Sequence, residues 1–167
     1  MAFTSLNDLL LEELQDLYSA ETQLLDALPK LADAASRPEL KSAFNKHLEE
    51  TREQVSRLEE VFDQLGESPG DEHCDAMAGL IAEEEKRIQE DGEADVKDAA
   101  LISAAQRTEH YEMAAYGSAR TFADQLDLIE VRDLLDETLS EEKSADEELN
   151  KVATGGWLGS GINQEAA

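Results

Sequence analysis

Residues 17–28, LYSAETQLLDAL, place a glutamate on the apolar stripe of a helix. Leu17, Leu24 and Leu28 recur at helical spacing, so they share one face of an α-helix. Glu21 lies four residues after Leu17 and three before Leu24, which puts it on the same face. A carboxylate buried there costs several kcal/mol unless a metal ion or a charged partner compensates it. The stretch therefore predicts a helix that carries an inward-facing carboxylate.

The same spacing of apolar residues continues outward along the chain, and Pro and Gly are scarce before the C-terminal tail. It predicts long helices at residues 5–35, 38–65, 94–124 and 128–153, and a shorter helix at residues 71–91. Short turns join the long helices into two antiparallel pairs, and the shorter helix connects the pairs. We expect an all-α, ferritin-like antiparallel four-helix bundle with a short crossover helix between the second and third long helices.

The 167 residues are enough for one domain. We expect the helical bundle to occupy residues 1–153, and residues 154–167 to form a flexible, glycine-containing tail that Trp157 docks loosely. The N-terminus lacks the basic and apolar regions of a signal peptide, and no apolar stretch is long enough to span a membrane. With one cysteine, Cys74, an intramolecular disulfide is excluded. These features predict a cytoplasmic protein that does not enter a membrane.

The chain carries 40 acidic and 14 basic residues, for a formal charge of −26. This charge disfavours binding to nucleic acid or to anionic lipid. Most of the carboxylates are expected to form a solvated surface. An inner glutamate therefore gains meaning from its position and not from the number of acids.

Four glutamates in the middle of the long helices are expected at one height of the bundle. Glu21 lies fifteen residues before the centre of the first turn and Glu50 fourteen after it, and helices rise about 1.5 Å per residue. Glu112 lies fourteen residues before the second turn and Glu142 sixteen after it. The separations within the pairs, 29 and 30 residues, suggest two related halves. Glu109 joins Glu112 on one helix face as an ExxE pair.

Oxygen ligands in this number suit iron, manganese or a similar ion, and two cations would neutralise most of the charge. The alternative is a non-catalytic helical interaction protein in which these acids form ion pairs. The histidines and tyrosines near the layer are open between metal-site and ordinary packing roles. The residues concerned are Arg52, Arg57, Arg107 and Lys143 as ion-pair partners, and His47, His110, Tyr18 and Tyr116.

A resemblance to a known family rests on four stretches, LYSAETQLL (17–25), HLEETREQVSRLE (47–59), AALISAAQRTEHYEMAAYG (99–117) and LLDETLSEEKSADEEL (134–149). They resemble the YciF/YciE-like family of bacterial stress-associated, ferritin-like proteins. The resemblance covers about residues 5–153, and the EHYE-containing stretch is its most specific part. It implies a fold akin to rubrerythrin, a homodimer and a dinuclear metal centre.

Similarity to rubrerythrin-type sites assigns the ligands helix by helix. Ferritin-like di-iron proteins often carry Glu-x-x-His on two helices, but Glu53 and Ala145 stand where those histidines would be. Gln54 and Asp146, one residue further on, occupy corresponding places as terminal ligands or hydrogen-bond acceptors. We expect two metal ions, iron first and manganese as the alternative, in a stress protein that reduces peroxide or dioxygen or oxidises Fe(II). The similarity makes Glu21 the ligand from the first helix, and Glu50 and Glu142 the bridging ligands from the second and fourth. The remaining implied metal-site residues are Glu109 and Glu112, which form the ExxE pair of the third long helix, and Gln54 and Asp146.

Overall fold

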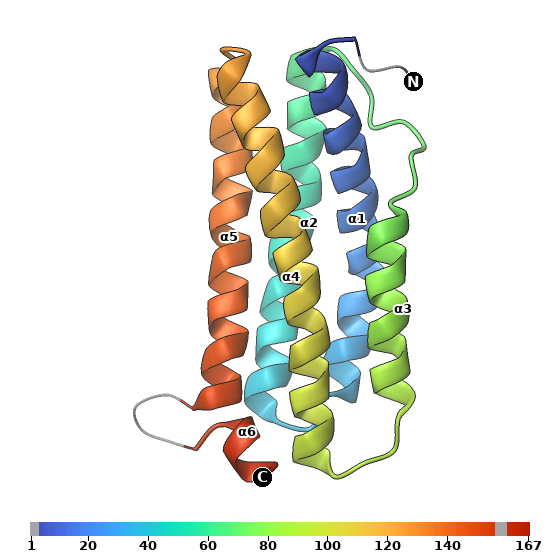
Figure 1. Cartoon of the computed structure of the whole chain (residues 1–167), viewed down its shortest axis with the longest axis vertical. Helices are drawn as coiled ribbons and strands as arrows, with labels where there is room; N and C mark the ends of the chain where they lie inside the picture. The colour runs from blue at the N-terminus through green and yellow to red at the C-terminus, as the bar shows by residue number, and fades with distance from the viewer. Residues whose placement is uncertain (1–3, 156–159) are drawn as a thin grey trace.

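The structure is a computed structural model that describes residues 4–155 and 160–167. Its helices are α1 Leu6–Ala34, α2 Pro38–Leu65, α3 Asp75–Gln89, α4 Ala94–Gln125, α5 Ile129–Thr154 and α6 Ile162–Glu165 (Figure 1). The described residues contain no strand. The expected all-α fold is confirmed, and the four long helices begin and end within one or two residues of the predicted bounds.

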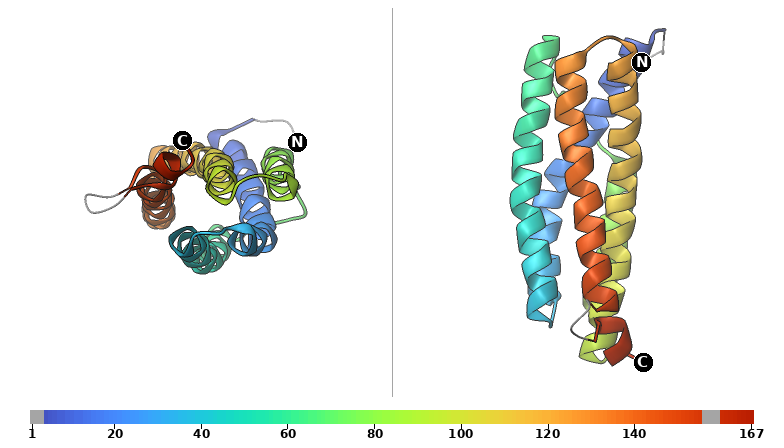
Figure 2. Two further views of the ribbon diagram at one scale, coloured as in Figure 1. Left: turned by 90° about the horizontal axis from the view of Figure 1, so that it is seen from below. Right: turned by 90° about the vertical axis from the view of Figure 1, so that its left-hand side faces the viewer.

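The four long helices stand around a common axis, and α3 lies outside this ring (Figure 2). Helices α1 and α2 form one antiparallel pair and α4 and α5 the other (Figure 1). The connection from α2 to α4 runs the length of the bundle and contains α3, which packs against α1 and α4. This is the predicted crossover, and it gives the bundle its ferritin-like connectivity.

Local sequence signals set the helix ends. Ser5 and Asp8 form a reciprocal capping box at the start of α1. Pro38 occupies the first turn of α2, where its missing N–H costs nothing. Helix α3 begins at Asp75 and not at residue 71, because the Cys74 sulfur accepts a hydrogen bond from the Met77 N–H at 3.3 Å and caps the helix there.

A buried carboxylate ties the first turn to the second helix pair. Asp98 of α4 accepts hydrogen bonds from the backbone N–H groups of Ser36 and Arg37, each at 2.8 Å. Asp98 is fully buried. These bonds fix the α1–α2 turn against the start of α4, and therefore help to set the relative height of the two helix pairs.

The apolar core is divided into two clusters along the bundle axis. One contains Leu24, Phe44, Leu101 and Leu149, and the other is built from residues nearer the opposite end of each helix, such as Leu10, Leu58, Tyr116 and Leu135. The segments between them, near residues 21, 47–54, 108–112 and 138–142, carry buried polar side chains. The interruption occurs on all four long helices at one height.

The C-terminal segment contains a short helix that the sequence pattern did not predict. Ile162 of α6 is buried, and α6 contacts α4 and α5. Trp157, which was expected to dock the tail, lies outside the described residues, and the flexibility of the tail stays a prediction. Among the helices of residues 4–155 and 160–167, none combines the length and apolar character needed to cross a membrane.

Candidate metal centre

A layer of buried polar side chains separates the two apolar clusters. Helices α1, α2, α4 and α5 each contribute to it, and α3 adds one residue from outside the ring. The acidic members are each at most 3% exposed. We call this set the polar layer; its buried members are Glu21, His47, Thr51, Gln54, Glu84, Thr108, Glu109, Glu112, Thr138 and Glu142.

Four members of the polar layer converge on one point. One ligand atom from each of His47, Glu109, Glu112 and Glu142 lies within 4.8 Å of the others. His47 Nε2 is 3.4 Å from Glu109 Oε2 and 3.7 Å from Glu142 Oε2. Glu109 and Glu112 reach the same point because residues three apart share one face of α4. The arrangement matches the donor set of a metal ion bound by imidazole and carboxylates.

Two of the acidic side chains are held by hydrogen bonds from within the bundle. The Tyr116 hydroxyl donates to Glu21 Oε1 at 2.5 Å, and the Gln54 amide donates to Glu142 Oε1 at 2.5 Å. Each glutamate thus has one oxygen fixed and the other, Oε2, without a partner. Fixed carboxylates of this kind are typical of preorganised metal ligands.

The polar layer contains nearly all of the buried side-chain N and O atoms that lack a hydrogen bond in the described residues. Buried polar atoms without partners are rare in native proteins, and each costs about 1–3 kcal/mol. Their concentration at one height makes the layer a candidate site for cations. Two of these atoms lie outside the layer: Glu50 Oε2, at its rim, and Arg120 Nε, which is 2.6 Å from Asp136 Oδ1 in an ion pair. The atoms within the layer are Glu21 Oε2, both ring nitrogens of His47, Gln54 Oε1, Glu84 Oε2, Glu109 Oε2, both oxygens of Glu112, and Glu142 Oε2.

Burial raises the pKa values of these carboxyl groups. It raises the pKa of Glu21 to about 8, with the charge of Glu142 adding to the effect. It also raises the pKa of Glu109 to about 8, and the pKa values of Glu112 and Glu142 rise well above the ordinary value. Burial alone would lower the pKa of His47, but the surrounding carboxylates outweigh it and the net pKa is raised. Without a cation the layer therefore retains protons near neutral pH.

Glu50 and Asp146 lie at the rim of the layer and not inside it. Glu50 pairs with Lys46 at 3.0 Å, with its other oxygen 3.7 Å from His47 Nδ1. Asp146 accepts a hydrogen bond from Gln106 at 2.9 Å and is partly exposed. Gln54, by contrast, is fully buried. Gln54 and Asp146 therefore differ in burial and in hydrogen-bond partners, and their predicted roles at a metal site stay predictions.

The structure separates the residues whose roles were left open. His47 belongs to the converging group, whereas His110 is largely exposed, 3.4 Å from Asp146. Tyr116 bonds to Glu21, whereas Tyr18 donates to Glu59 at 3.2 Å and packs edge-on against Phe62. The signal for His47 was its position three residues after Phe44 and four before Thr51 on the buried stripe of α2.

Sequence reasoning missed Glu84, although the signal was present. Met77, Ile81, Glu84 and Ile88 recur at intervals of four, three and four residues, which is the inward stripe of α3. Glu84 is buried, and its Oε1 accepts a hydrogen bond from the Thr108 hydroxyl at 2.8 Å.

The cations that could have neutralised the layer pair elsewhere. Arg57 binds Glu141 at 2.9 Å, Arg107 lies 3.8 Å from Glu83, and Arg52 pairs with its helix neighbour Glu49. Over residues 4–155 and 160–167, the ion pairs of Lys and Arg include none of the buried glutamates at positions 21, 84, 109, 112 and 142. This speaks against the ionic network proposed as the alternative.

A small cavity adjoins the layer between α2 and α5. Its volume is about 10 Å³, enough for about one water-sized molecule. Lys46 lies at its rim, where it pairs with Glu50 and with Glu148 at 3.1 Å. His47 and Glu109 also line the cavity, so it leads from the surface toward the converging group.

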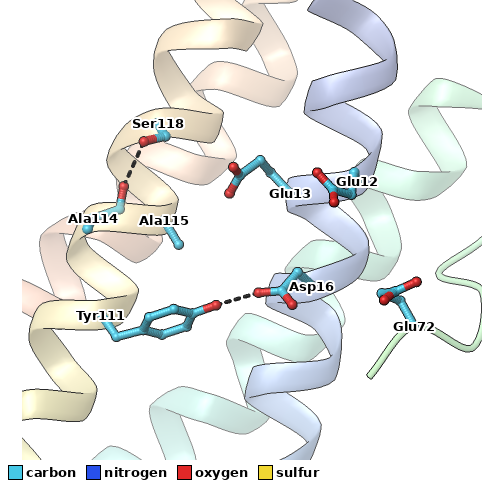
Figure 3. A pocket seen from close by; sticks show the side chains of 8 residues that line it. All are labelled: Glu12, Glu13, Asp16, Glu72, Tyr111, Ala114, Ala115 and Ser118. Atoms are coloured by element: carbon cyan, nitrogen blue, oxygen red, sulfur yellow. Dashed lines mark hydrogen bonds between the residues drawn. The ribbon is translucent and has the colours of Figure 1, made fainter. Parts of the chain in front are cut away.

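A larger pocket, of about 370 Å³, lies between α1 and α4 (Figure 3). The Tyr111 hydroxyl donates to Asp16 across it. The lining acids are solvated or half-buried, and no unpartnered buried side chain of the described residues points into it. The pocket therefore carries no assignment; its lining residues are Glu12, Glu13, Asp16, Glu72, Tyr111, Ala114, Ala115 and Ser118.

Comparison with known proteins places the chain in a family. Residues 5–167 match the family described as "Domain of unknown function (DUF892)". The chain is 44% identical to protein YciF of Escherichia coli over 154 residues, which are 92% of this chain and 93% of YciF.

Solved structures agree with this relationship. The crystal structure of the E. coli stress protein YciF has a TM-score of 0.87 at 43% identity, covering 89% of this chain and 94% of that one. YcfI from Rhodopseudomonas palustris also has a TM-score of 0.87, at 40% identity, covering 91% and 99%. A protein from Xanthomonas campestris, 21% identical with a TM-score of 0.70, covers 88% and 89% and bears on the fold alone. The matched span and the identity to YciF show that this chain belongs to the DUF892 family of YciF-like proteins.

Proposed function

We propose that the polar layer is a dinuclear metal centre, with iron as the resident metal and manganese as the alternative. The observation that carries this proposal is the concentration of unpartnered buried carboxylate and imidazole atoms at one height of the bundle. Such atoms are costly without cations. Carboxylate oxygens combined with imidazole suit iron and manganese.

The residues that would hold the ions are the converging group of His47, Glu109, Glu112 and Glu142, together with Glu21. Glu50, at the rim, is a further candidate ligand, because its Oε2 lies 3.7 Å from His47 Nδ1 while its other oxygen pairs with Lys46. Gln54 and Tyr116 hold ligand carboxylates by hydrogen bonds. Asp146 is a candidate ligand only after its bond to Gln106 is released.

The proposed activity is reduction of peroxide or dioxygen, or oxidation of Fe(II), during stress. Two adjacent redox-active ions supply electrons and Lewis acidity for a small oxidant. The chain itself excludes bulk water through the apolar clusters above and below the layer. The cavity beside His47 limits access to a molecule of about the size of water. Peroxide and dioxygen have two heavy atoms each, so the side chains that line the cavity would have to move to admit them.

The relatives give the stress role its support and also name a second candidate. YciF is called a stress protein in its crystal structure. YcfI is named as a candidate structural protein, which favours a structural role for this fold as the alternative. The homodimer is a proposal that rests on the family resemblance, and the cytoplasmic location is a proposal that rests on the sequence of the N-terminus.

Metal analysis of the variants Glu109→Gln/Glu142→Gln and Glu53→Gln/Glu147→Gln tests the proposal. The first pair removes two charges from the converging group, and the control pair removes two exposed charges from the same or a neighbouring helix. In a metal protein purified without chelator, the first pair should lose metal and the stabilisation that metal gives. In a structural bundle it should be neutral or stabilising, and wild-type protein that ignores Fe(II) and Mn(II) would refute a metal centre.

A further inference from the structure

The crossover helix contributes a carboxylate to the polar layer from outside the four-helix ring. Glu84 lies on α3, which packs against α1 and α4 (Figure 2). It is 2% exposed, and on α3 only Met77 is buried to a similar degree. A helix that shields only one edge of a bundle could use an apolar residue here, so the acid calls for an explanation.

The neighbours of Glu84 show that its burial is selective. Helix α3 has three successive glutamates, and the outer two face cations: Glu83 lies 3.8 Å from Arg107 and Glu85 is 2.8 Å from Lys30. Glu84 has no such cation among the described residues. Its Oε1 accepts one hydrogen bond from Thr108 and its Oε2 has no partner. Fixing one oxygen and leaving the other free repeats the arrangement of Glu21 and Glu142.

Glu84 is close to the converging group. Thr108, which holds it, directly precedes Glu109 on α4. Burial, and after it the charge of Glu84, raises the pKa of Glu109, and Glu84 also adds to the raised pKa of Glu112 after burial and other acids. A further carboxylate next to these groups increases like-charge repulsion unless a cation binds among them.

We propose that Glu84 is a metal ligand, and that with Glu21 and Glu112 it binds the second ion on the α1–α4 side of the centre. This inference rests on the proposed function. His47 then serves the ion on the α2–α5 side, next to the small cavity. The two subsites differ in chemistry, because one includes an imidazole nitrogen and the other has carboxylate oxygens alone.

This difference has a consequence for metal preference. An all-carboxylate subsite suits hard ions such as Mn(II), whereas a subsite with imidazole also accepts softer ions. The two ions should therefore bind with unequal affinity and not as an equivalent pair.

Mn(II) binding to Glu84→Gln and to the control Glu83→Gln tests the inference. Gln keeps the volume and the acceptor for Thr108 but loses the charge, and Glu83→Gln removes an exposed charge one residue away. We expect wild type and Glu83→Gln to bind two Mn(II) ions per chain by calorimetry and elemental analysis, with the magnetic coupling of a Mn pair in electron paramagnetic resonance. Glu84→Gln should bind one ion normally and the second at least about tenfold more weakly, with an uncoupled Mn(II) signal.

Two coupled ions in Glu84→Gln at wild-type affinity would overturn the inference while leaving the dinuclear centre intact. If the wild type itself binds no Mn(II) and no Fe(II), the proposed function has failed instead. Folding is checked on the metal-free proteins, where Glu84→Gln should melt at or above the wild-type temperature at pH 8. Should Glu84→Gln not fold, Glu84→Asp keeps the charge with a shorter side chain and should weaken the second ion similarly; unchanged binding by Glu84→Asp also counts against the inference.

Discussion

Glu112 offers the sharpest separation between a metal centre and a structural layer. Both of its carboxylate oxygens are buried without a partner, and a ligand atom of Glu142 lies within 4.8 Å of it. In Glu112→Gln an amide of the same shape replaces the carboxyl group and brings two N–H donors toward acceptors that lack hydrogen bonds. The same substitution removes a central ligand if the layer binds metal.

If the layer binds metal, Glu112→Gln should change the stability of the metal-free and of the metal-bound protein in opposite directions relative to wild type. In the metal-free protein at pH 8, Glu112→Gln replaces a buried carboxyl group that has to keep its proton with an amide that is always neutral and supplies hydrogen bonds, which should stabilise by about 1–3 kcal/mol. For a chain of this size about 1 kcal/mol corresponds to roughly 2–4 °C, so Tm should rise by about 2–12 °C. With metal at about 100 times its Kd, the wild type gains about 2.7 kcal/mol that the variant does not.

The assay is a pair of thermal melts, with chelator and with Mn(II), followed by circular dichroism at 222 nm. Glu112→Gln should melt above wild type in chelator and at or below it in saturating Mn(II), whereas the exposed control Glu53→Gln should follow wild type in both. A variant that is less stable than wild type in chelator would show that the carboxylate is satisfied without metal. A rise in Tm on adding Mn(II) that is as large in Glu112→Gln as in wild type would remove Glu112 from the ligand set.

Three further measurements follow from the same contacts. A carboxyl group whose folded pKa is raised stabilises fully below its unfolded pKa and loses this contribution as pH rises toward the folded value. With Glu21 and Glu109 moved from 4.5 to about 8, metal-free protein should lose stability to urea between about pH 5 and 8 and change little above that. Constant stability across this range would contradict the raised values. Tyr116→Phe removes the hydroxyl that donates to Glu21, so it should weaken metal binding and lower the stability of the metal-free protein by about 1–3 kcal/mol. A variant with unaltered metal affinity would make Tyr116 a packing residue. Asp98→Ala removes the acceptor of two backbone N–H groups in the α1–α2 turn, so the free energy of unfolding in urea should fall by about 2–4 kcal/mol. A fall of less than about 0.5 kcal/mol would show that water takes the place of the carboxylate.

The helical fold and the height of the site could be predicted because both depend on periodicity. Apolar spacing determines which face of each helix is buried, and equal distances from two turns place Glu21 and Glu142 at one level. Both are fully buried in the structure. Glu84 obeys the same spacing and was missed because α3 was treated as a connection and not as part of the site.

Side-chain partners that come from other helices could not be predicted in this way. Spacing placed Glu50 among the inner residues, yet it lies at the rim, where it pairs with Lys46 and lines the small cavity between α2 and α5. Asp146 is likewise held outward by Gln106. These outcomes depend on rotamers and on contacts between helices, which one helical wheel does not contain. Helix α6 has too few residues to show a period at all.

The division of the core into two apolar clusters has a consequence for how cooperatively the bundle unfolds. Each cluster is held together by its own apolar packing, whereas the layer between them contains buried polar atoms that lack hydrogen-bond partners. Without cations, the bundle resembles two short four-helix units joined end to end by shared helices, and its middle is the place where backbone amides should first exchange with solvent. Cations bound in the polar layer would link the four long helices at their midpoints, so that the two ends unfold as one cooperative unit.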